Sequence, residues 1–205
     1  MNTCKILIGL SGKMGVGKDY IAQNIILPYL EQRNIKTLII AFADQIKVNT
    51  SVKNNISLSK MYDTKNEDIR KLLQKEGTEN GRDKYGNNIW IDYVDKWTDV
   101  YSKKGIQAFI ITDCRFKNEV DYIKKNNGVI FRIEAPLRNK ERIYKEKNSL
   151  EIQKHISEID LDDYKFDNII NNDYISNEEN ELINKNIKDN IYKILNIHIN
   201  NYHQL

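Results

Sequence analysis

Residues 5–20 read KILIGLSGKMGVGKDY, and this stretch is the most informative in the chain. Positions 6–10 form an apolar run, which is typical of a strand buried on both faces of a parallel sheet. Glycines interrupt the chain next, and from Ile21 onward apolar residues recur at helical spacing. The stretch therefore predicts a strand, a glycine loop and a helix in direct succession.

The loop matches the pattern G-x-x-x-x-G-K between Gly12 and Lys18. Glycines let backbone N–H groups converge on phosphate oxygens, and the start of the following helix adds a partial positive charge. Lys18 would then bridge the terminal phosphates. The alternative is a glycine-rich turn that binds no ligand. The residues expected to bind ATP are Gly12, Lys13, Met14, Gly15, Val16, Gly17, Lys18, Asp19 and Tyr20.

Asp19 stands where the general pattern has a serine or threonine whose hydroxyl holds Mg²⁺. A carboxylate can contact Mg²⁺ directly or through water, so Asp19 is the candidate metal residue. An acidic side chain also suits the start of a helix electrostatically, and that purely structural role stays open. Tyr20 follows, so the next position offers no short hydroxyl either.

Further apolar runs predict strands at residues 36–42, 108–112, 129–133 and 168–170. Helices are predicted at residues 67–76, 90–101, 118–125 and 178–195, with a turn-rich passage at 77–88. Pro28 is expected to kink the first helix or end it early. This alternation predicts an α/β chain with a three-layer P-loop NTPase fold. Its parallel, doubly wound central sheet would carry helices on both faces and a small helical lid at about residues 136–163.

Composition narrows the class of protein. A length of 205 residues suits one domain over residues 1–205, and 32 basic against 29 acidic residues leave a net charge too small to argue for wrapping a nucleic acid. Cys4 and Cys114 lack metal-ligand spacing, which favours a reducing compartment. No apolar run reaches the roughly 20 residues that span a bilayer, and no leader pattern is present, so a cytoplasmic protein without membrane contact is expected.

Charged residues also follow the other predicted strands. Asp113 comes directly after the strand at 108–112, where ligands bind in open α/β folds, and Arg115 and Glu119 follow it. Asp44 ends the second predicted strand, with Lys47 behind it. A carboxylate at a strand end is also a common helix cap, so both readings stay open.

The middle of the chain adds Arg70, Gly77, Thr78, Arg82 and Trp90 as candidates for substrate binding. Arginine holds phosphate bidentately, and tryptophan offers a flat face to a base, although such residues are often surface charge and core.

The charged segment after the fourth strand contains Arg138 and Arg142, which could close over transferring phosphates as a lid does. The same charge run could equally be a solvated face. His155 has no nucleophile pattern near it and is not interpreted as catalytic.

Taken together, these motifs resemble the deoxynucleoside monophosphate kinases of bacteriophages and related elements, which are P-loop kinases. The resemblance extends from the N-terminus to about residue 173, and the ending G-K-D combined with D-x-R-F-x-N-E makes it narrow. Its five stretches are residues 11–19, 42–47, 70–79 with Arg82 and Trp90, 112–119 and 155–158.

The resemblance implies transfer of the ATP γ-phosphoryl group, with Mg²⁺, to a deoxynucleoside 5′-monophosphate. By resemblance, the pocket for the monophosphate would be formed by Arg70, Gly77, Thr78, Trp90, Asp113, Arg115 and Glu119. With the candidates given above, the expected substrate residues also include Asp44, Lys47 and Arg82, and the expected catalytic residues are Lys18, Arg70, Arg115 and Arg142. Alternatives are a P-loop kinase of dephospho-coenzyme A or phosphomevalonate type and a nucleotide-binding module without activity. The expected partners are small molecules, with no sequence-specific nucleic acid and no membrane; a homodimer is left open.

Overall fold

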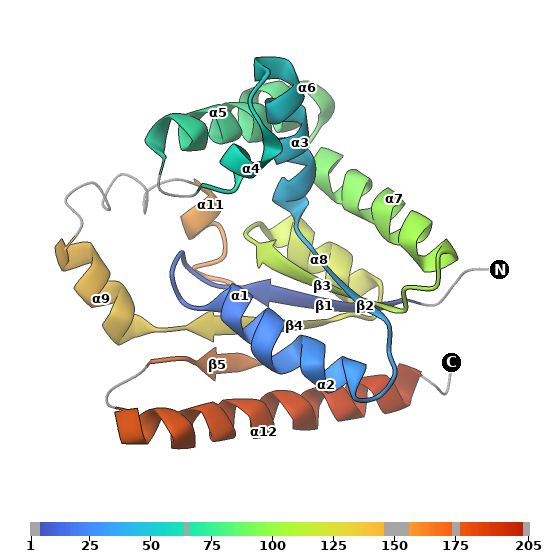
Figure 1. Cartoon of the computed structure of the whole chain (residues 1–205), viewed down its shortest axis with the longest axis vertical. Helices are drawn as coiled ribbons and strands as arrows, with labels where there is room; N and C mark the ends of the chain where they lie inside the picture. Colours follow the sequence, from blue (N-terminus) through green and yellow to red (C-terminus); the bar gives the residue numbers. More distant parts are fainter. Residues whose placement is uncertain (1–4, 64–65, 146–155, 174–176, 203–205) are drawn as a thin grey trace.

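A computed structural model describes residues 5–63, 66–145, 156–173 and 177–202. Five parallel strands form one sheet in the order β2-β3-β1-β4-β5, so the first strand lies at its centre (Figure 1). The strands are β1 (Ile6–Ser11), β2 (Thr37–Ile40), β3 (Ala108–Cys114), β4 (Val129–Glu134) and β5 (Ile169–Asn171). The predicted parallel α/β architecture is confirmed, and every carboxyl end of a strand meets the same edge.

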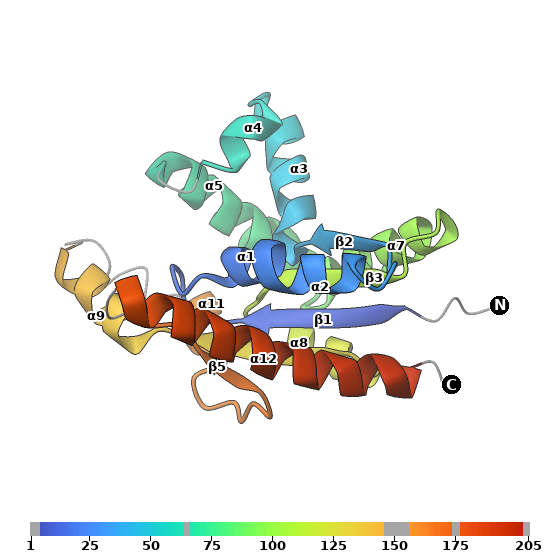
Figure 2. The same cartoon turned by 60° about the horizontal axis from the view of Figure 1, so that its bottom comes forward.

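Alternation along β1 sends side chains into two separate cores. Ile6, Ile8 and Leu10 belong to one apolar cluster, whereas Leu7 belongs to the other. The first cluster includes the helix after the glycine loop and α12 (Asn177–Tyr202); the second includes α3 (Phe42–Asn54), α7 (Ile89–Lys103) and α8 (Lys117–Lys125). Helices therefore cover both faces of the sheet, giving three layers (Figure 2).

The helix after the glycine loop continues through Pro28, which neither ends nor visibly breaks it. It comprises α1 (Lys18–Ile21), a π-helical turn η1 (Ala22–Ile26) and α2 (Leu27–Glu31). The wide π-turn changes the hydrogen-bond spacing directly before the proline. Pro28 then falls in the first turn of α2, where a missing N–H is tolerated.

The middle of the chain is more helical than the sequence suggested. Helix α3 was not predicted, and Phe42, expected at the end of a strand, begins it. The passage predicted to be turn-rich contains η2 (Thr78–Arg82) and α6 (Asp83–Tyr85). The remaining helices here are α4 (Leu58–Met61), α5 (Glu67–Gly77) and α7. Helices α3 to α6 project together above the carboxyl edge of the sheet (Figure 1).

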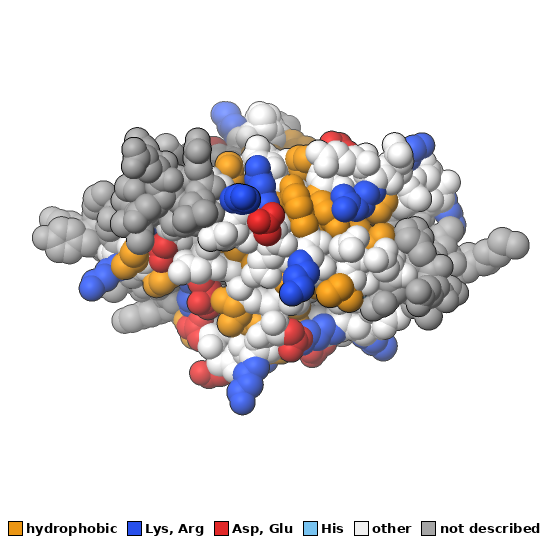
Figure 3. Space-filling model, turned by 90° about the horizontal axis from the view of Figure 1, so that it is seen from below, with side chains coloured by type: hydrophobic (Ala, Val, Ile, Leu, Met, Phe, Trp, Pro, Cys, Tyr) orange, Lys and Arg blue, Asp and Glu red, His pale blue; other side chains and the backbone are white. Residues whose placement is uncertain are grey.

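The lid predicted at about residues 136–163 contains α9 (Pro136–Lys145) and α11 (Ile156–Ile159), and residues 146–155 lie outside the described part. Helix α12 covers the underside, where Figure 3 shows acidic and basic side chains interspersed with small apolar areas. Among the described helices, none is long and apolar enough to cross a membrane. Cys114 is a buried free thiol, whereas Cys4 lies outside the described residues.

Candidate phosphotransfer site

The glycine loop joins β1 to α1 at the carboxyl edge of the sheet. Gly12, Gly15 and Gly17 all have positive φ angles of 150°, 82° and 90°, a region that side chains disfavour. A Cβ atom at Gly12 would lie 2.4 Å from the Ile133 carbonyl oxygen. The loop is therefore tightly packed on the end of β4, and only glycine fits there.

Lys18 begins α1 and turns back over the loop. Its Nζ atom donates to the carbonyl oxygens of Gly12 at 2.7 Å and Lys13 at 2.9 Å. These bonds hold the ammonium group over the loop, where it is suited to bind phosphate oxygens. The predicted anion cradle and its lysine thus come together in the structure.

Two polar side chains that sequence reasoning did not assign to the loop support it from behind. Asn172, at the end of β5, donates from Nδ2 to the Val16 carbonyl at 2.8 Å. Arg138, expected in a moving lid, donates from Nη2 to the same carbonyl at 3.0 Å and to the Asn172 carbonyl at 2.5 Å. No local signal in the sequence links positions 138 and 172 to the loop, because the contacts form only once β4 and β5 are adjacent.

The base of the loop is held by β4 and by the segment before β5. Arg132 donates to the Ser11 hydroxyl at 3.2 Å, and Lys13 forms an ion pair with Asp162. Lys13 therefore already has a carboxylate partner at the mouth of the loop.

Asp19 and Tyr20 are exposed in the first turn of α1, directly beside the loop. Within the described residues no group of three or more His, Cys, Asp or Glu side chains could by itself hold a metal ion. A Mg²⁺ ion that travels with a nucleotide takes most of its ligands from phosphates and water, and needs only one or two carboxylates from the protein. The exposed carboxylate of Asp19 fits that requirement.

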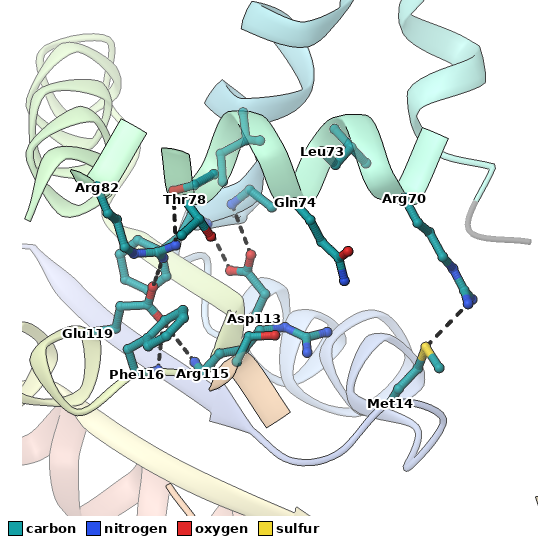
Figure 4. Close-up of a pocket in the computed structure, with 15 residues that line it drawn as sticks. Met14, Arg70, Leu73, Gln74, Thr78, Arg82, Asp113, Arg115, Phe116 and Glu119 are labelled. Carbon is teal, nitrogen blue, oxygen red and sulfur yellow. Dashed lines mark hydrogen bonds and ion pairs between the residues drawn. The ribbon is translucent and has the colours of Figure 1, made fainter. Parts of the chain in front are cut away.

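A pocket of about 240 Å³ opens next to the loop, between β3 and the α3–α5 helices (Figure 4). Arg70 lies at its end nearest the loop, where Nη2 is 3.7 Å from the sulfur of Met14. Arg70 and the glycine loop, the two features suited to bind phosphate, therefore lie next to each other. The pocket is lined by Met14, Phe42, Ala43, Ile46, Arg70, Leu73, Gln74, Gly77, Thr78, Arg82, Asp113, Arg115, Phe116, Glu119 and Ser157.

At the inner end of the pocket, Arg82 and Glu119 form an ion pair of 3.2 Å. Arg82 also lies 4.1 Å from the ring centroid of Phe116. The other Glu119 oxygen accepts hydrogen bonds from the backbone N–H groups of Arg115 and Phe116. Burial, followed by the nearby charge of Asp113, raises the pKa of Glu119 to about 8.

Asp113 lines the pocket but also has a structural task. Its two carboxylate oxygens accept from the backbone N–H groups of Phe42 at 2.8 Å and Ala43 at 2.9 Å, so it caps α3. Burial raises the pKa of this carboxyl, against the lowering effect of those N–H groups. The structural reading of this strand-end acid is therefore confirmed, and the same residue also lines the pocket.

The structure does not support Asp44 and Lys47 as pocket residues. Asp44 accepts from the Ala41 N–H at 2.8 Å and pairs with Lys47 at 3.2 Å, within the first turn of α3. Neither side chain lines the pocket. The position of Asp44 after a predicted strand suggested a ligand site, but an acidic residue is also favourable at the start of a helix, and that is where Asp44 lies.

Trp90 does not present its face to the pocket. Its side chain is 2% exposed, and Nε1 donates to the Gly77 carbonyl at 2.8 Å. A Cβ at Gly81 would lie 2.2 Å from the indole. Trp90 therefore shapes the pocket by fixing the α5–η2 junction, and cannot stack on a base there.

One candidate residue, Arg142, and one residue of the motif stretches, His155, have side chains outside the described part of the chain. The other predicted substrate residues, which are Arg70, Gly77, Thr78, Arg82, Asp113, Arg115 and Glu119, lie together in the pocket.

A phosphate cradle and an arginine-bearing pocket open side by side at one edge of a parallel sheet, and that arrangement defines a P-loop kinase. Comparison with protein families agrees: the chain belongs to the family whose model is described as phosphomevalonate kinase, which matches residues 10–129. It is also 30% identical over 152 residues to a protein of Acanthamoeba polyphaga mimivirus named "Putative deoxynucleotide monophosphate kinase". That alignment covers 64% of this chain and 75% of the viral protein.

Among solved structures, the chain is similar to APE1195, with a TM-score of 0.47 and 14% identity over 95% of this chain and 97% of that one. The shikimate kinase of Aquifex aeolicus gives a TM-score of 0.43 and 16% identity over 93% and 99%. The relationship to deoxynucleotide monophosphate kinases that the motifs predicted is confirmed by the viral relative. The protein is a kinase of the P-loop type.

Proposed function

We propose that this kinase transfers the γ-phosphoryl group of ATP to a deoxynucleoside 5′-monophosphate. The observation that carries the proposal is the polarity of the pocket. Arg70 gives the end beside the glycine loop a positive charge, whereas at the inner end Arg82 is paired with Glu119 and lies against the ring of Phe116 (Figure 4). A nucleoside monophosphate has the same polarity, with an anionic phosphate at one end and a neutral ring at the other.

On the donor side, the glycine loop and Lys18 would hold the β- and γ-phosphates of ATP. Mg²⁺ bound with the nucleotide would supply charge neutralisation, and Asp19, in the first turn of α1, would hold it. Asn172 and Arg138 keep the loop in its binding shape through the Val16 carbonyl.

On the acceptor side, Arg70 and Arg115 would hold the phosphate of the monophosphate and stabilise the transferring group. Phe116 and Ile46, whose side chain lies beside Gly77, offer apolar surface for the base. Because the acceptor oxygen is already anionic, it needs little base catalysis. Positioning and electrostatic stabilisation supply most of the rate enhancement of phosphoryl transfer.

The family description raises phosphomevalonate as a second acceptor, and the lining of the pocket favours the nucleotide. Phosphomevalonate carries a carboxylate at the end remote from its phosphate. At that end of the pocket lie the carboxyls of Asp113 and Glu119, and Arg82 is already paired with Glu119. Because Arg82 is already paired with Glu119, the remote carboxylate of phosphomevalonate would have to compete for it, whereas a neutral base needs no cation there.

A panel of acceptors tests the proposal. ADP release is coupled to a spectrophotometric readout, with ATP and Mg²⁺ and with dAMP, dCMP, dGMP, dTMP, dUMP, phosphomevalonate or dephospho-coenzyme A. At least one deoxynucleotide is expected to give a kcat/KM at least about tenfold above either metabolite. The proposal is wrong if a metabolite is the better acceptor, or if no deoxynucleotide releases ADP above background.

A further inference from the structure

One face of α5 and η2 lines the acceptor pocket from end to end. Arg70, Gln74 and Thr78 are spaced four residues apart, and Figure 4 shows them projecting from this helical wall toward the pocket. A rise of 1.5 Å per residue separates successive members by about 6 Å along the axis. The wall therefore presents three polar side chains at regular depth.

If the acceptor is a nucleotide, as proposed above, the order of these three side chains matches the order of phosphate, sugar and base. Arg70 lies at the end beside the glycine loop, where the acceptor phosphate must meet the donor. One helical turn deeper is comparable with the distance from phosphorus to the sugar ring across the 5′-oxygen and 5′-carbon. Gln74 is at that depth, and Thr78 is one further turn inward, with Arg82 and Glu119 at the base end.

The side-chain amide of Gln74 is also available to hydrogen-bond a ligand. This amide has no hydrogen-bond partner among the residues that the structure describes, although it lines the pocket. The pocket carboxyls of Asp113 and Glu119 already accept hydrogen bonds from the protein. A glutamine amide can both accept from a hydroxyl and donate to it.

We infer that Gln74 binds the sugar of the acceptor nucleotide through its 3′-hydroxyl, the one free sugar hydroxyl of a 2′-deoxynucleoside 5′-monophosphate. This inference rests on the proposed function. A hydroxyl that leaves water on entering the pocket must be hydrogen-bonded again, or binding is weakened. Gln74 is thus a substrate-positioning residue that favours acceptors with a 3′-hydroxyl.

Paired changes in enzyme and substrate test the inference. Wild type and Gln74→Met, which keeps length and helix propensity, are each assayed with the best deoxynucleoside monophosphate and with its 2′,3′-dideoxy analogue. Wild type should prefer the deoxynucleotide in kcat/KM by about fivefold to tenfold, the effect of one neutral hydrogen bond. Gln74→Met should lose that preference by losing activity on the deoxynucleotide alone.

Two further variants control the result. Lys75→Met changes an exposed neighbour on the same helix that does not line the pocket, and should keep the wild-type preference. Gln74→Glu retains an acceptor for the 3′-hydroxyl and should retain most of the preference. Equal losses on both substrates in Gln74→Met would overturn the inference. Wild type that transfers to no monophosphate would instead contradict the proposed function, and this inference with it.

Discussion

Glu119 is a carboxyl group in an environment that disfavours its charge. It is buried at the inner end of the acceptor pocket, and burial together with Asp113 raises its pKa to about 8 from an ordinary value of 4.5. Between these pH values, the native state holds a proton that the unfolded chain has released. Stability from this group is therefore complete below about pH 4.5 and is lost as the pH rises toward about 8.

A neutral replacement isolates this contribution. The free energy of unfolding of wild type minus that of Glu119→Gln should fall by about 1 kcal/mol per pH unit between about pH 5.5 and about pH 7.5. Urea denaturation followed by circular dichroism measures it. Glu79→Gln, at an exposed position, should show no such trend. A difference that stays constant or grows with pH would contradict the assigned environment.

For single residues, the sequence predicted a role wherever neighbouring positions form a recognisable motif. Lys18 and the loop glycines follow from spacing alone, because loop, helix start and lysine are contiguous. Trp90 was misjudged, since its contact with the Gly77 carbonyl depends on how α7 packs against η2.

Among the elements, the glycine loop and the end of β5 act as one unit. Gly17 has φ 90°, and a Cβ there would lie 2.5 Å from the Nδ2 atom of Asn172. That side chain is itself hydrogen-bonded to the Val16 carbonyl and is almost fully buried. It cannot move aside without giving up the bond that shapes the loop.

Two glycine substitutions separate backbone strain from this contact. Gly105 has φ 93° but no atoms within 4 Å of an added Cβ, so Gly105→Ala should cost only the strain, about 1–2 kcal/mol. Gly17→Ala should cost at least about 1 kcal/mol more, because the contact adds to the strain. Urea denaturation of both variants gives the comparison. Equal costs would mean that Asn172 does not brace the loop.

Secondary structure was predictable wherever the sequence of an element itself contains the pattern that specifies it. Apolar runs identified the five strands to within a few residues. Helix α3 was missed because its first N–H groups are capped by Asp113, some 70 residues later in the chain. Such a cap exists only in the folded molecule.

For the whole molecule, the parallel sheet explains why the two sites meet. Strand β1 ends in the donor loop, and its neighbour β3 ends in Asp113 and Arg115 of the acceptor pocket. The sheet order places those two ends side by side, and residues of α3 and α5 line the pocket above them. Both helices lie above the sheet in Figure 1. The central claim is therefore that a single edge holds donor and acceptor for direct transfer.

Product analysis tests that claim most directly. Wild type and Lys18→Ala are incubated with ATP, Mg²⁺ and each deoxynucleoside monophosphate, and the nucleotides are separated by ion-exchange chromatography. Wild type should convert at least one monophosphate to its diphosphate with an equal amount of ADP. Lys18→Ala should remain folded and lose at least about 100-fold in rate. ADP without deoxynucleoside diphosphate, or an unaffected Lys18→Ala variant, would contradict the account.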